Sequence, residues 1–149
     1  SLLEALVFAQ RAVDASLRQR HERKGPYPTL PDWTSGHAVD SDESIVVSHN
    51  WDEIRRLMSN YVSIFRSNKR LERAKRRIDA LAGEIHQYYW DFLVTNDLIE
   101  LRNLVLVADL IITSAMIRKE SRGLHYNINY PVTDNETWKR DTIMWRGYR

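Results

Sequence analysis

The 149-residue sequence contains no cysteine, and its five glycines are scattered singly along the chain. The lack of cysteine excludes a disulfide framework, a thiolate metal site and cysteine catalysis, so a cytoplasmic location is the simplest expectation. The scattered glycines exclude a glycine-rich phosphate-binding loop. The formal net charge of +2 at pH 7 is too small to favour nucleic-acid binding through the bulk electric field.

Long hydrophobic runs are also missing. The most apolar segment, 104–117, is interrupted by Asp109 and falls short of the roughly 20 residues that cross a bilayer. The first apolar run contains Glu4 and has no basic leader, which is unlike a secretory signal. We therefore expect no membrane partner. Because Ser1 begins inside a helical pattern with no initiator methionine, we expect the chain to be a fragment of a longer protein.

What the sequence does contain is helical periodicity. Apolar residues at three- and four-residue spacing predict amphipathic helices at 50–65, 69–93 and 97–121. Asn50 and Glu53 form a capping box that would begin the first of these helices. Apolar residues surround more than half of the last, which predicts that it is the most buried. The apolar stripe of the second suits shallow-angle packing in a bundle and consists of Leu71, Ala74, Ile78, Leu81, Ile85, Tyr88 and Phe92.

These patterns predict an all-α fold. It is a three-helix antiparallel bundle resembling a spectrin repeat, preceded by an extra N-terminal helix and followed by an irregular tail. The expected domain organisation is a helix at 1–20, a linker at 21–49, the bundle domain at 50–131 and a tail at 132–149. The linker is rich in proline and glycine, with a short strand expected at 45–47. The tail is polar, and we expect it to be loosely ordered.

An unusual apolar segment follows the third predicted helix. Gly123 suits the left-handed conformation that ends a helix, and the basic residues just before it lie near the last helical carbonyls. A surface turn does not require the apolar and aromatic residues found in 124–131. This strand-like segment is therefore expected to pack against something, and His125 within it is a candidate acid or base.

The strongest positive cluster lies at 69–77 and could grip phosphates. Nearby acidic residues balance it and no groove-reading motif accompanies it, so we expect a solvated or interdomain face. No two of the five histidines have the spacing of metal ligands, and no nucleophile elbow supports a Ser-His-Asp triad. The residues alone predict no metal site and no catalytic residue.

Four runs carry a resemblance to a known family. They are Glu-Ile-Arg-Arg-Leu-Met at 53–58, Lys-Arg-Leu-Glu-Arg-Ala at 69–74, Glu-Leu-Arg-Asn-Leu-Val at 100–105 and Arg-Lys-Glu-Ser-Arg-Gly-Leu-His at 118–125. In this order and spacing they resemble the C-terminal region of the L-aspartate oxidase family. That family is a branch of the succinate dehydrogenase and fumarate reductase flavoproteins. The sequence departs from the family pattern at Ser59, Ser63 and Asn129, where Trp, Gly and Asp are usual.

The resemblance implies a function for the parent protein and a structural role for this part of it. In the family, L-aspartate is oxidised to iminoaspartate by hydride transfer to FAD, which oxygen or fumarate reoxidises; the product feeds NAD biosynthesis. The substrate-binding groups lie upstream of Ser1, so the fragment is expected to be non-catalytic and not to retain FAD. The implied partners are the parent's own FAD-binding and capping domains, its substrates and, as a further partner, quinolinate synthase. The helix at 1–20 would belong with the FAD domain.

One pair of cofactor-binding residues is implied by the same resemblance. Ser1 and Leu2 match a Ser-Leu pair that opens a helix beside the flavin, where free N–H groups suit an electron-rich partner. The segment after Gly123 would fold over the bundle or onto the flavin domain, which makes His125 a structural residue. Two alternatives remain: the C-terminal domain of a succinate dehydrogenase or fumarate reductase flavoprotein subunit, and a free-standing helical adaptor or nucleic-acid-binding module that uses the 69–77 face.

Overall fold

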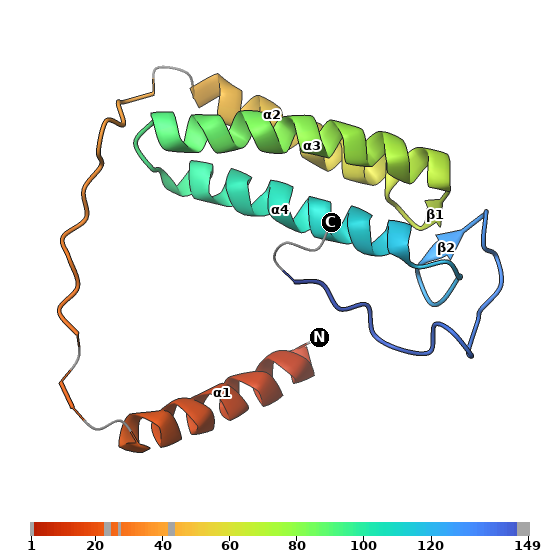
Figure 1. Cartoon of the computed structure of the whole chain (residues 1–149), viewed down its shortest axis with the longest axis horizontal. Coiled ribbons are helices and arrows are strands. Elements are labelled where there is room, and N and C mark those ends of the chain that lie inside the picture. Colours follow the sequence, from red (N-terminus) through yellow and green to blue (C-terminus); the bar gives the residue numbers. More distant parts are fainter. Residues whose placement is uncertain (1, 23–24, 27, 42–43, 146–149) are drawn as a thin grey trace. The chain divides into compact units, whose positions relative to one another are not determined.

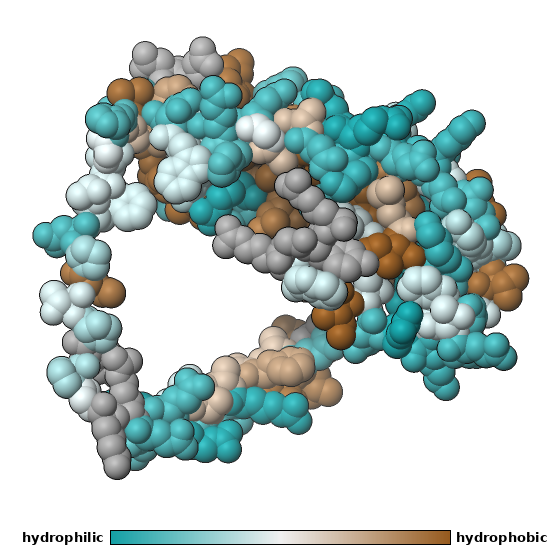
Figure 2. All heavy atoms as spheres, in the orientation of Figure 1, coloured by the Kyte–Doolittle hydropathy of each residue, from teal (hydrophilic) through white to brown (hydrophobic). Residues whose placement is uncertain are grey.

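The computed structural model describes residues 2–22, 25–26, 28–41 and 44–145. The chain divides into two compact units, Ser1–Thr34 and Ser35–Arg149. The first unit contains the helix α1 (Leu2–Glu22), which has no buried residue. One side of α1 is apolar and the other hydrophilic (Figure 2), so its apolar side chains are exposed within this chain.

The second unit is built from three helices, α2 (Ser44–Tyr61), α3 (Asn68–Asp91) and α4 (Asn96–Ile117). Successive helices run in opposite directions and lie side by side (Figure 1), and each helix contacts the other two. The predicted all-α fold is confirmed. The core lies between the three helices, and its largest fully buried apolar side chains are Ile54, Leu71, Ile78, Leu81, Ile85, Leu98, Leu101 and Ile112.

Short polar caps define the starts of α3 and α4. The Ser67 hydroxyl accepts a hydrogen bond from the backbone N–H of Arg70, and the Thr95 hydroxyl accepts one from the N–H of Leu98, each at 3.2 Å. Both caps have extended backbone conformations, as expected of residues that satisfy free N–H groups at a helix start. Because these caps end the preceding loops sharply, the α2–α3 and α3–α4 connections are short and successive helices lie next to one another.

The start of the first bundle helix differs from the prediction. The helix α2 begins at Ser44, so the expected strand at 45–47 is wrong and Asn50 is not an N-cap. Asn50 is instead a buried residue inside the helix. The capping-box prediction was wrong because Asn50 and Glu53 both lie inside α2, where residues three positions apart are also neighbours on one helical turn.

The end of the last helix also differs, because α4 stops at Ile117 with Arg118 as its cap and does not extend to 121. Gly123 has the expected left-handed conformation, with φ of 57°, but it lies in the turn beyond the helix. A two-stranded parallel pairing that the sequence did not predict joins β1 (Phe65–Arg66) to β2 (Tyr126–Asn127), with Phe65 opposite Tyr126.

Candidate functional site

The charged and polar groups of the 118–123 run are gathered around Glu120, whose side chain is fully buried. Its Oε1 atom accepts hydrogen bonds from Arg118 Nε at 2.9 Å and Arg122 Nε at 2.8 Å. Its Oε2 atom accepts from Arg122 Nη2 at 3.0 Å and from the backbone N–H of Asp134 at 2.9 Å. Hydrogen bonding by Arg122, followed by that from Asp134 and Arg118, overcomes burial and lowers the pKa of Glu120 to about 2. Glu120 is therefore charged near neutral pH, and its contacts hold neighbouring segments together.

The two arginines also bind the tail. Arg118 Nη1 donates to the carbonyl of Arg140 at 3.1 Å and to the Thr142 hydroxyl at 3.0 Å. Its Nη2 donates to the carbonyl of Trp138 at 2.5 Å, and its guanidinium lies 5.9 Å from the centre of that indole ring. The segment from 134 to 142 is thus held against the end of α4, which differs from the loose order expected of the tail.

Ser121 ties together the segment that follows the turn. Its hydroxyl accepts from the backbone N–H of Asn127 at 3.0 Å and donates to the carbonyl of Tyr130 at 2.7 Å. Asn127 is buried, and its side chain donates to Asn68 Oδ1 at the start of α3, at 3.1 Å. The expectation that the 124–131 segment packs against other parts of the fold is confirmed, because it pairs with the α2–α3 connection.

His125 meets a residue that the sequence did not single out. Arg66 Nη1 lies 2.7 Å from His125 Nδ1, and since a guanidinium only donates, the ring must be neutral with its proton on Nε2. Burial, and then the nearby Arg66 charge, hold the pKa of His125 below its usual range. The two residues are 59 positions apart, so no local sequence signal could have paired them.

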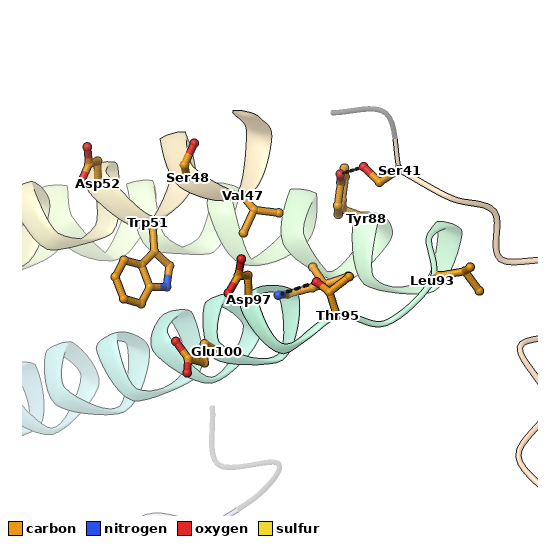
Figure 3. A pocket seen from close by; sticks show the side chains of 11 residues that line it. Ser41, Val47, Ser48, Trp51, Asp52, Tyr88, Leu93, Thr95, Asp97 and Glu100 are labelled. Atoms are coloured by element: carbon orange, nitrogen blue, oxygen red, sulfur yellow. Dashed lines mark hydrogen bonds between the residues drawn. The ribbon is translucent and has the colours of Figure 1, made fainter. Parts of the chain in front are cut away.

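A cavity of about 460 Å³ opens between α2 and the start of α4. Figure 3 shows Trp51 and Asp97 pointing into the space between these helices, with a Ser41–Tyr88 hydrogen bond at one end. Asp52 and Glu100 add two further carboxylates to its lining. Acidic side chains at a helix start are common because they complement the helix dipole, so this cavity assigns no chemistry by itself.

The basic cluster at 69–77 is partly engaged within the bundle. Lys75 pairs with Asp79 and with Asp109 on α4, the latter at 3.1 Å, and Arg77 pairs with Glu53 on α2. These contacts fit the expected face of balanced charge. In the described part of the chain, no cluster of three or more His, Asp or Glu side chains could hold a metal ion. None of the described helices has the length and hydrophobicity needed to cross a membrane.

The family resemblance named Ser1 and Leu2 as cofactor-binding residues. Ser1 falls outside the described residues, whereas Leu2 is the first residue of the helix and is 93% exposed. A helix start leaves backbone N–H groups free, which is the property that a cofactor contact there requires. Leu2 belongs to the first unit and the Glu120 cluster to the second.

Comparison with known proteins identifies a family model and several relatives that match this chain. Residues 51–149 match the family described as "Fumarate reductase flavoprotein C-term", which covers the bundle helices and the Glu120 cluster. The chain is 51% identical over 144 residues to an L-aspartate oxidase of Pseudomonas aeruginosa, a match covering 97% of this chain and 26% of that protein.

Relatives from other organisms give the same result. An L-aspartate oxidase 1 of Ralstonia nicotianae is 53% identical over 133 residues, covering 89% of this chain and 25% of the relative. A chloroplastic L-aspartate oxidase 2-b of Nicotiana tabacum is 36% identical over 162 residues, covering 100% of this chain and 25% of the relative. The chain therefore spans about a quarter of the length of the curated relatives it matches.

Proposed function

Because the chain belongs to the family of fumarate reductase flavoprotein C-terminal domains, we propose that it is the C-terminal part of an L-aspartate oxidase. The observation that carries this proposal is the similarity to L-aspartate oxidases along nearly the whole chain, α1 and the tail included. The proposed activity of the parent is oxidation of L-aspartate to iminoaspartate in NAD biosynthesis. FAD, when bound, supplies the hydride acceptor, and oxygen or fumarate removes the electrons.

The chain's own role in this proposal is structural. Glu120 and Ser121 form hydrogen bonds within the domain: Glu120 binds two arginines and Ser121 binds two backbone groups. A carboxylate so strongly stabilised in its charged form is a poor proton acceptor. The cluster instead fixes the tail and the β1–β2 pairing to the end of α4, which gives the domain one defined surface for its neighbours.

The first turn of α1 is the proposed point of contact with FAD. Leu2 opens the helix, and the exposed start of a helix suits an electron-rich flavin edge or phosphate. The apolar side of α1 would then be covered by the parent's FAD-binding domain, with the domain boundaries at 20, 49 and 131. The remaining proposed partners are the parent's capping domain, L-aspartate, fumarate or oxygen, and quinolinate synthase, in the cytoplasm.

The central test compares the intact polypeptide with this chain. Under anaerobic conditions we expect L-aspartate, and not succinate, to bleach the flavin absorbance of the intact polypeptide. On admission of oxygen it should form peroxide. The 149-residue chain mixed with FAD and L-aspartate is expected to do neither. Turnover by the chain alone would overturn the proposed structural role, and bleaching by succinate would favour a succinate dehydrogenase or fumarate reductase subunit.

The proposed flavin contact has a separate test. Leu2→Pro removes one backbone N–H while remaining compatible with the first turn of a helix. In the intact polypeptide we expect it to lower FAD retention after gel filtration, whereas Leu2→Ala, which keeps the N–H, should not. Equal FAD content in both variants would contradict a contact through this backbone group.

The binding-module alternative is tested on the 69–77 face. We expect the chain to give no DNA or RNA gel shift at low salt, because acidic side chains pair with Lys75 and Arg77 on this face, so reversal of Arg73 and Arg76 to Glu should change nothing. A gel shift that weakens with added salt and disappears in the reversed variant would instead support nucleic-acid binding.

A further inference from the structure

One side of α4 is apolar but exposed. Its side chains Leu106, Val107, Leu110 and Ile111 are 56%, 51%, 41% and 42% exposed, and together we call them the outer α4 face. They recur one helical turn apart, as the buried residues do, so apolar residues surround more than half of α4. A helix with this pattern is normally buried on every side. Among the described residues of the second unit, those on the opposite side of α4 are buried, whereas the outer α4 face is not.

A pocket continues the outer α4 face toward the end of the helix. It has a volume of about 330 Å³, and Leu110, Ile111 and Ser114 form its wall on α4. Arg66 and His125 supply its polar side, with Thr142 of the tail also lining it. The apolar face and this Arg66–His125 pocket are therefore one continuous surface, because Leu110 and Ile111 belong to both.

No carboxylate is among the residues that line the pocket, whose polar members are Arg66, Ser114, Arg118, His125 and Thr142. Arg66 is half-buried, and among the described residues it forms no ion pair: its Nε donates to the carbonyls of Val62 and Ser63, and Nη1 to His125. The Nε2–H of His125 is buried and forms no hydrogen bond of normal geometry in the described part of the chain, although the nearby Arg118 backbone partly opposes the lowering of its pKa by burial. A carboxylate would complement this site, because it would neutralise the half-buried Arg66 charge and accept a hydrogen bond from His125. A buried charge without a counter-charge and a buried donor without an acceptor both cost free energy.

We infer that the outer α4 face is the surface on which the preceding domains of the same polypeptide dock, with a carboxylate side chain entering the Arg66–His125 pocket. The inference rests on the proposed function, since it takes the chain as the C-terminal quarter of a longer flavoprotein. The preceding domains are the expected occupant because this chain spans only about a quarter of the length of its relatives, and because the pocket is positively charged. An apolar face ringed by donors fits a surface of apolar side chains with one acidic residue among them.

The absence of cysteine makes the docking directly measurable. Single thiols are introduced as Ile111→Cys on the outer α4 face and as Ala80→Cys, an exposed α3 residue outside the pocket. Each is labelled with a maleimide in the 149-residue chain and in the intact polypeptide, and labelled peptides are quantified by mass spectrometry. The rate at 111 is expected to fall about tenfold or more in the intact polypeptide, while the rate at 80 is unchanged, because interface side chains are desolvated.

Three outcomes would overturn the inference. Equal rates at 111 in both proteins would show that nothing preceding the chain covers this face. Slow labelling in the isolated chain would assign the cover to a second copy if it depends on concentration, and to the chain itself if it does not. Leu110→Cys repeats the measurement if Ile111→Cys does not give the helical circular dichroism of the unmodified chain.

The charged part of the inference has its own variant. In the intact polypeptide carrying Ile111→Cys, adding Arg66→Gln is expected to speed labelling severalfold, and Arg66→Lys to restore most of the protection. Unchanged protection with Arg66→Gln would overturn the carboxylate contact. Because labelling does not depend on turnover, protection without L-aspartate oxidation would defeat only the proposed activity, and oxidation without protection would defeat only the docking surface.

Discussion

At the residue scale, two glycines illustrate how backbone conformation decides the effect of one methyl group. Gly123 has φ of 57°, whereas Gly83 lies inside α3, and a Cβ added at either meets no atom within 4 Å. We expect Gly83→Ala to stabilise the chain by about 0.5–1 kcal/mol and Gly123→Ala to destabilise it by about 1 kcal/mol. Urea denaturation followed by circular dichroism measures both. Shifts of the same sign would contradict this explanation.

Glu120 provides the residue-scale prediction for pH. Its pKa is lowered from 4.5 to about 2 in the fold. A group with a depressed folded pKa stabilises the fold above its unfolded pKa, and this stabilisation is lost as pH falls through the folded pKa. The urea concentration at the unfolding midpoint should therefore decrease as the pH is lowered from about 4.5 to about 2.

Glu120→Gln should be less stable near neutral pH, with a midpoint that changes less over the same acidic range. The comparison isolates one carboxylate, because every other titrating group is shared by both proteins. Parallel pH profiles for the two proteins would show that the acid sensitivity arises elsewhere.

At the element scale, α4 carries two adjacent isoleucines with opposite environments. Ile112 is fully buried among the three helices, whereas Ile111 is 42% exposed on the outer α4 face. In the 149-residue chain, Ile112→Ala should cost about 2–5 kcal/mol of unfolding free energy, since it leaves a cavity. Ile111→Ala should cost about 1 kcal/mol or less, since 42% of its surface is already in water. Similar losses measured by urea denaturation would mean that the outer face is covered.

The elements also show where helical patterns are ambiguous. Val46 and Val47 read as strand residues, yet they form the first turns of α2, and Val47 packs against the core. Tertiary burial overrides the weak local preference of β-branched residues. The stripe of α3 was read correctly at its five buried positions, from Leu71 to Ile85, because its spacing keeps one side toward both neighbouring helices.

At the scale of the whole molecule, the described core belongs to one unit. Every described residue that is buried lies between Asn50 and Asn127, and α1 contributes none. We expect a chain that begins at Ser35 to unfold at the same temperature as the 149-residue chain, with only the helical signal of α1 lost. Differential scanning calorimetry and circular dichroism provide the measurement. A fall in the unfolding temperature of more than about 4 °C would mean that α1 stabilises the bundle by roughly 1 kcal/mol or more.

The all-α class, the three bundle helices and the family resemblance could all be predicted from the amino-acid sequence. These features depend on helical periodicity and on short motifs, both of which involve residues that are close together in the sequence. Only the tertiary structure decided that Glu120 is buried between Arg118 and Arg122, and that Arg66 meets His125. The same is true of the exposed side of α4, because a helix with apolar residues around more than half of its circumference contains no local signal of which part its neighbours cover.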